Sequence, residues 1–118
     1  DHAKALLKVI RNGVIGETYN IGGHNEITNL EVVNTICSIL DEVVPLKNSS
    51  YLNQIIHVSD RKGHDQRYAI DATKIKRELG WMPQEDFNSG IMKTINWYLN
   101  NKSWSKKIRP YLGKKKST

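Results

Sequence analysis

Three short runs of strand character alternate with four helical stretches, and this alternation limits what the chain can fold into. The strand-like runs occupy residues 17–21, 55–58 and 68–70. Runs this few and this short cannot build a complete doubly wound sheet that carries helices on both faces. We therefore expect a small α/β fold with about four helices and three short strands, of the kind that closes over a larger domain.

The helical stretches show clear start and stop signals. We expect helices over residues 1–12, 28–44, 72–79 and 87–100. Thr28 and Glu31 have the spacing of a capping box, and Gly13 and Gly80 stand where helices end. The first helix has an apolar face, which comprises Ala3, Leu6, Leu7 and Ile10.

Length and composition indicate one small intracellular domain. The chain has 118 residues and 38% hydrophobic residues, and no apolar run approaches the roughly 20 residues that a membrane helix needs. The single cysteine, Cys37, excludes an internal disulfide and favours a cytoplasmic location. The chain starts at Asp1 inside a helical pattern, so we expect it to be a piece of a longer polypeptide.

Positive charge is concentrated at the end of the chain. Of the net charge of +6, much comes from Lys106, Lys107, Arg109, Lys114, Lys115 and Lys116. We expect residues 105–118 to be a basic, disordered tail that follows a domain of residues 1–104. Such a tail could bind nucleic acid or acidic lipid, but a solvated terminus with no nucleic-acid or membrane partner is the favoured interpretation.

A dense polar loop over residues 59–67 is the best candidate for a ligand site. It contains Arg61, Lys62, His64 and Arg67 around Gly63. Arginine presents a planar fork of donors that matches phosphate oxygens, and glycine lets the backbone approach a ligand closely. The loop therefore suits an anionic, phosphorylated ligand, although the residue types equally fit a solvated charged loop.

Three motifs carry a likeness to a known family, at residues 19–26, 60–71 and 78–83. They read Tyr-Asn-Ile-Gly-Gly-His-Asn-Glu, Asp-Arg-x-Gly-His-Asp-x-Arg-Tyr-Ala-Ile-Asp and Glu-Leu-Gly-Trp-x-Pro. Together they resemble the C-terminal part of the dTDP-glucose 4,6-dehydratases, members of the extended short-chain dehydrogenase/reductase family. The substrate domain of another nucleotide-sugar epimerase or dehydratase is the alternative, because single motifs recur across those enzymes.

The resemblance implies a substrate-binding subdomain of an extended Rossmann-type dehydratase. It implies that the site consists of Asn29, Asp60, Arg61, Lys62, Gly63 and His64. In the family the arginine of this loop meets the substrate diphosphate, which is the role expected for Arg61. The family usually has proline where this chain has Lys62. Lysine does not fix φ as proline does, so it loosens the loop, and it adds a positive charge.

The resemblance also implies the reaction and the partners. The family converts dTDP-glucose to dTDP-4-keto-6-deoxyglucose with loss of water, using NAD, and we expect a homodimer. This chain has no Gly-x-Gly-x-x-Gly fingerprint, so NAD is expected to be bound by the missing Rossmann domain. We assign no catalytic residue here and expect the isolated chain to be inactive. Tyr98 with Lys102 and Tyr111 with Lys115 match the catalytic Tyr-x-x-x-Lys spacing only by chance, and the histidines lack metal-ligand spacing.

Overall fold

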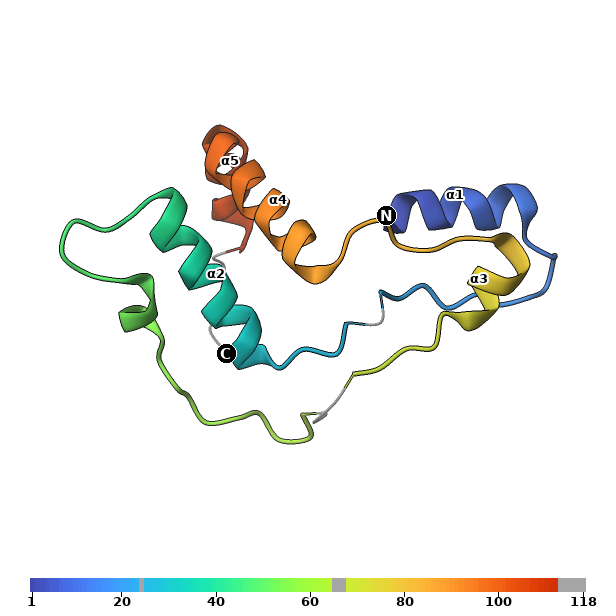
Figure 1. The fold of residues 1–118 in the computed structure, drawn as a ribbon, viewed down its shortest axis with the longest axis horizontal. Helices are drawn as coiled ribbons and strands as arrows, with labels where there is room; N and C mark the ends of the chain where they lie inside the picture. Colours follow the sequence, from blue (N-terminus) through green and yellow to red (C-terminus); the bar gives the residue numbers. More distant parts are fainter. Residues whose placement is uncertain (24, 65–67, 113–118) are drawn as a thin grey trace.

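The computed structural model describes residues 1–23, 25–64 and 68–112, with side chains in the last helix described as far as Ile108. Its elements are α1 (His2–Asn12), α2 (Asn29–Val43), the 3-10 turn η1 (Tyr51–Gln54), α3 (Thr73–Leu79), α4 (Phe87–Asn100) and α5 (Lys102–Leu112). α1 and α3 form one group, and α2, η1, α4 and α5 form a second (Figure 1). The four expected helices are confirmed, and η1 and α5 are additional.

The expected α/β fold with three short strands is wrong, because none of the described residues forms a strand. Residues 17–21, 55–58 and 68–70 run as open chain, and the described backbone hydrogen bonds outside the helices close turns and helix ends. A strand is stable only when a neighbouring backbone supplies partners for its N–H and C=O groups. The apolar pattern identified these segments correctly as non-helical, but it carries no information on whether another segment lies beside them to pair with.

Two of these segments nevertheless meet. A Cβ atom placed on Gly22 would overlap the Ile70 side chain, so the backbone at position 22 lies directly against Ile70. The pair Gly22-Gly23 is typical of a turn. The structure gives a further reason for glycine at position 22: a side chain there would prevent the close approach of two segments that are far apart in the sequence.

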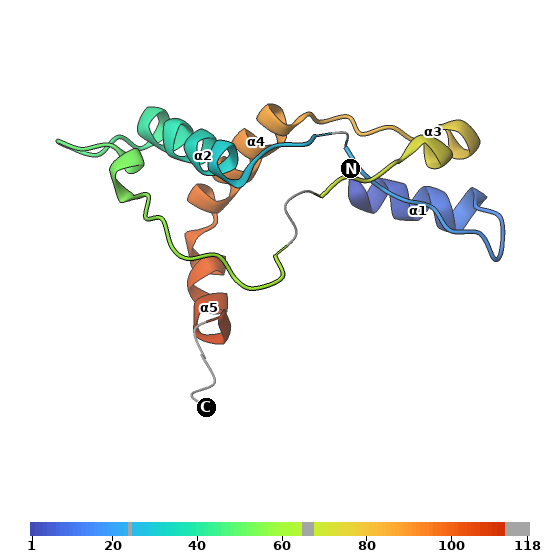
Figure 2. The same ribbon diagram turned by 90° about the horizontal axis from the view of Figure 1, so that it is seen from below.

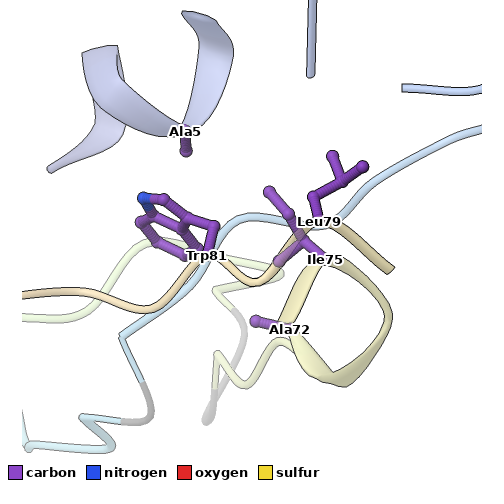
Figure 3. Close-up of a cluster of buried hydrophobic side chains, with 5 residues drawn as sticks. All are labelled: Ala5, Ala72, Ile75, Leu79 and Trp81. Atoms are coloured by element: carbon purple, nitrogen blue, oxygen red, sulfur yellow. The ribbon is translucent and has the colours of Figure 1, made fainter. Parts of the chain in front are cut away.

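The main apolar cluster joins α1 to α3 (Figure 3). Ala5 and Ile75 are completely buried, and the indole of Trp81 lies between the two helices. The other members of the cluster and its partly buried neighbours are Ala72, Leu79, Val9, Tyr19 and Ile21. Trp81 is the largest of these side chains, so it anchors both helices.

Polar contacts fasten the start of α1 to the segment that precedes α4. The carboxylate of Asp1 accepts hydrogen bonds of 2.9 Å from the backbone N–H groups of Gln84 and Glu85. The ammonium of Lys4 donates to the side-chain oxygen of Gln84 at 2.5 Å. These bonds hold the start of α1 against residues 84 and 85, beside the apolar cluster.

The second group is ordered by side-chain bonds at both ends of α2. The backbone N–H groups of Thr28 and Glu31 each donate to the other residue's side chain, at 2.8 and 3.2 Å, which confirms the capping box. The hydrogen bond from the Thr28 hydroxyl lowers the pKa of Glu31. The carboxylate of Asp41 accepts bonds from the Ser50 hydroxyl and the Tyr51 N–H, which hold η1 against α2.

The described chain is open and exposes much apolar surface. Its radius of gyration is 18.3 Å, whereas a compact chain of this length would have roughly 13.5 Å. On α1, Leu6, Leu7 and Ile10 are 47%, 46% and 80% exposed, although they belong to the expected apolar face. Ala5 and Val9 contact the core instead. Exposed apolar surface of this extent is typical of a protein–protein contact.

α5 packs against α4 and projects away from α2 and from the group formed by α1 and α3 (Figure 2). Helix therefore covers the first part of the segment expected to be a disordered tail, up to Leu112. Residues 113–118 lie outside the described residues, and the division into residues 1–104 and 105–118 stays a prediction. None of the described helices has the length and apolar character needed to cross a membrane.

Two glycines provide a matched test of backbone conformation. Gly80 ends α3 with φ +60°, whereas Gly90 lies inside α4, and a Cβ at either would meet no atom closer than 3.8 Å. Gly80→Ala should lower the free energy of unfolding by about 1–2 kcal/mol, because alanine is strained at positive φ. Gly90→Ala should raise it by about 0.5–1 kcal/mol. Urea unfolding of the full-length protein measures both, and changes of the same sign would contradict the assignment.

Candidate functional site

A tight turn over residues 60–64 presents the site residues expected from the sequence. The backbone N–H of His64 donates to the carbonyl oxygen of Arg61 at 3.3 Å, which closes the turn. Gly63 lies inside it with φ +72°, a conformation that side chains other than glycine rarely adopt. Gly63 is therefore needed for the shape of the turn itself.

Asp60 organises this turn from within. Its Oδ1 atom accepts the backbone N–H of Arg61 at 2.8 Å and lies 2.7 Å from Nδ1 of His64. The bond to His64 lowers the pKa of Asp60, so the carboxylate stays ionised at neutral pH. A carboxylate repels phosphate oxygens, and both of these contacts of Asp60 are within the turn. Its geometry is therefore that of a positioning group and not of an anion ligand.

The two cations of the turn point to solvent. Arg61 and Lys62 are both exposed, and within residues 1–23, 25–64 and 68–108 neither forms an ion pair. The guanidinium offers a planar set of donors, which suits two oxygens of one phosphate or of a diphosphate. The turn thus places the planar guanidinium of Arg61 next to Lys62, whose ammonium is carried on a flexible stem.

A pocket of about 140 Å³ lies next to the turn. It is lined by Gly23, Asn25, Glu26, Tyr68, Ala69 and Ile70, so it joins two of the sequence motifs. The ring of Tyr68 has its centroid 6.5 Å from that of His64, which connects the pocket to the turn. These lining residues were absent from the expected site. The contact of Gly22 with Ile70 explains their proximity, and no local sequence pattern encodes that contact.

Asn29 is the first residue of α2, as expected, and it is exposed. Within the described residues, no hydrogen bond joins it to the turn at residues 60–64. The structure therefore holds Asp60, Arg61, Lys62, Gly63 and His64 in one turn, and leaves Asn29 on a separate element. Arg67, the last cation of the polar loop, lies outside the described residues. The described part of the chain has no group of three side chains that could hold a metal ion.

Comparison with known proteins shows that the chain belongs to the family described as GDP-mannose 4,6 dehydratase, whose model matches residues 1–94. The dTDP-glucose 4,6-dehydratases of Shigella flexneri and Neisseria meningitidis are 62% and 58% identical to it, over 92% and 88% of this chain. The chain spans 30% of the length of each of these relatives. The family resemblance inferred from the three motifs is confirmed.

Two solved structures have the same fold over most of the chain. The dTDP-glucose 4,6-dehydratase of Bacillus anthracis, in complex with NAD, matches with a TM-score of 0.74 and 43% identity over 87% of this chain. The enzyme of Streptomyces venezuelae, also with NAD bound, matches with a TM-score of 0.76 and 38% identity over 87%. The chain covers 30% of each of those chains. The open arrangement of helices is therefore shared with part of a larger enzyme.

We expect the turn to loosen in acid. The hydrogen bond from His64 holds the pKa of Asp60 below its ordinary value of 3.8, so the carboxylate stabilises the turn above that pH. This contribution is lost as the pH falls through the lowered pKa. The NMR shift of the Arg61 amide proton, which donates to Asp60, should therefore titrate with a midpoint below 3.8. Asp60→Asn should abolish the transition, and a midpoint above 3.8 would contradict the geometry.

Proposed function

We propose that this chain is the nucleotide-sugar-binding part of a dTDP-glucose 4,6-dehydratase, which converts dTDP-glucose to dTDP-4-keto-6-deoxyglucose with loss of water. The observation that carries the proposal is the turn at residues 60–64, which holds Arg61 free of described carboxylates beside a pocket. The relatives named for this reaction, up to 62% identical, support the choice of enzyme.

The proposed roles combine the geometry of the turn with those that the family resemblance implies. Arg61 binds the diphosphate, Lys62 and His64 assist it, and Gly63 lets the turn approach the ligand. Asp60 positions the turn. Asn29 lies at the start of α2, where helix N–H groups favour anionic groups, and it contacts the nucleotide sugar once the rest of the enzyme closes the site. Holding the remote part of a substrate contributes to catalysis by orienting the reacting carbon atoms.

NAD belongs to the part of the enzyme outside these residues. The two solved relatives hold NAD, and the sequence here has no Gly-x-Gly-x-x-Gly motif to bind a dinucleotide. We therefore infer that the Rossmann domain of the same polypeptide supplies the cofactor and the catalytic groups. The exposed apolar face of α1, with Leu6, Leu7 and Ile10, is where we expect that domain to pack.

The full-length protein tests the reaction directly. Incubated with NAD and dTDP-glucose, it should give a product lighter by one water in mass spectrometry, whereas residues 1–118 alone should give none. GDP-mannose is the second candidate, because the matching family model is described by that substrate. Turnover of GDP-mannose in preference to dTDP-glucose would replace the proposed substrate, and turnover by the isolated chain would refute the division of roles.

The assembly and the location are further parts of the proposal. The family resemblance implies a cytoplasmic homodimer, with the dimer formed by the complete enzyme. Analytical ultracentrifugation of the full-length protein should give twice the mass of one chain. A monomer at micromolar concentration would contradict the assembly and leave the site assignment unaffected.

A further inference from the structure

The positive charge of the chain is segregated at α5 and the residues that follow it. Seven of the 18 Lys and Arg residues, and none of the 12 acidic residues, lie within residues 102–118. The rest of the chain therefore has a formal charge of −1. A strongly basic end on an otherwise neutral body is the charge distribution that favours an anionic surface.

Three aromatic side chains gather where α5 meets α4. The ring centroid of Trp97 lies 5.2 Å from that of Tyr98 and 4.9 Å from that of Trp104. All three rings remain 44–50% exposed. Aromatic side chains with one polar atom and a large apolar body are favoured at boundaries between apolar and wet surroundings. A half-exposed cluster of three such rings forms an aromatic patch beside the lysines of α5.

α5 brings the charge and the aromatic patch together. Trp104 and Ile108 are one helical turn apart and share a face of α5, whereas Lys102, Lys106 and Lys107 are exposed. Packing against α4 leaves the helix projecting from the body (Figure 2). Lys102 and Lys106 are each two residues from Trp104 and lie on the opposite side of the helix, whereas Lys107 is three residues on and flanks the ring. A helix with basic residues on one side and tryptophan on the other is typical of helices that lie in the headgroup region of a bilayer.

We propose that α5 and the aromatic patch form a docking surface for a bilayer that contains anionic phospholipid. The lysines meet lipid phosphates, and Trp97, Tyr98 and Trp104 enter the boundary between headgroups and acyl chains. Nucleic acid offers the same phosphate charge, but its backbone offers no apolar layer for the rings. Composition alone favoured a solvated tail, because only a helix sorts Trp104 and the lysines around a common axis.

Vesicle flotation of the full-length protein tests the proposal. The protein should float with vesicles of phosphatidylcholine and phosphatidylglycerol, and should stay at the bottom with pure phosphatidylcholine. Lys106→Gln with Lys107→Gln should weaken the binding on the order of 30-fold, since each lysine near an anionic surface contributes about fivefold. The control is Lys47→Gln with Lys76→Gln, which removes the same charge from exposed sites elsewhere and should have no effect.

A second variant separates lipid from other polyanions. Trp104→Ser keeps the charge of α5 and should weaken vesicle binding, with no change in binding to double-stranded DNA. The proposal is overturned if the protein does not float with anionic vesicles, or if the control pair loses as much vesicle binding as the Lys106 and Lys107 pair. It is also overturned if the protein binds DNA as tightly as vesicles and Trp104→Ser weakens neither. Dehydratase turnover should be unchanged in both α5 variants, so this result is independent of the proposed reaction.

Discussion

Arg61→Gln in the full-length protein should raise the KM for the proposed substrate, dTDP-glucose, by about 10- to 100-fold, because a charge-assisted bond to a phosphate contributes roughly 1.5–3 kcal/mol. Glutamine keeps the length of the side chain but loses the charge and the fork of donors. The backbone N–H of Arg61, which Asp60 accepts, is unchanged by the substitution. Steady-state kinetics with saturating NAD measures the effect.

Arg77→Gln is the matched control. Arg77 lies on α3, away from the turn, and its guanidinium pairs at 2.7 Å with the carboxylate of Glu78. Arg77→Gln therefore removes the same charge as Arg61→Gln without changing the turn. The Arg77 side chain is 69% exposed, and exposed ion pairs contribute little to stability. The KM of this variant should match that of the wild type. Equal KM values for Arg61→Gln and wild type would remove Arg61 from the site.

The split between KM and kcat shows what the arginine does. A group that binds substrate and transition state equally raises KM alone when it is removed. If the diphosphate also orients the sugar against the catalytic domain, kcat falls as well. Lys62→Gln should have a smaller effect than Arg61→Gln, because an ammonium on a flexible stem makes no fixed two-pronged contact.

Local signals in the sequence were sufficient for α1, α2, α3 and α4, whereas α5 was not predicted. The capping box of Thr28 and Glu31 and the glycine at position 80 act within a few residues of the helix ends that they define. The apolar spacing of α1 also predicted its existence correctly. It did not predict which face is buried, because Ala5 and Val9 contact α3, while the larger Leu6 and Leu7 are left exposed.

Long-range contacts account for what the sequence did not predict. Strands depend on hydrogen bonds to a neighbouring backbone, and no such ladder forms within the described residues, so the α/β expectation failed at residues 17–21, 55–58 and 68–70. The turn around Gly63 was predictable as a local feature. The pocket was not, because it depends on the packing of Gly22 against Ile70.

Trp81→Ala should lower the free energy of unfolding by about 3–5 kcal/mol, the usual cost of removing a buried aromatic side chain. Trp81 is 7% exposed and fills the space between α1 and α3, where Ala5 and Ile75 contribute only small or medium side chains. A loss of this size is a large part of the 5–15 kcal/mol typical of a domain. Urea unfolding of the full-length protein, followed by circular dichroism, measures it.

Met82→Ala tests whether the loss of stability in Trp81→Ala comes from removing a buried side chain or from any change in the segment between α3 and α4. Met82 is the next residue in the chain and is 55% exposed, so its replacement should change the free energy of unfolding by no more than about 0.5 kcal/mol. The cluster around Trp81 also includes Tyr19 and Ile21, which precede Gly22 at the edge of the pocket. Trp81→Ala should therefore weaken substrate binding through loss of this support. Comparable losses of stability in the two variants would show that the indole does not anchor α1 to α3.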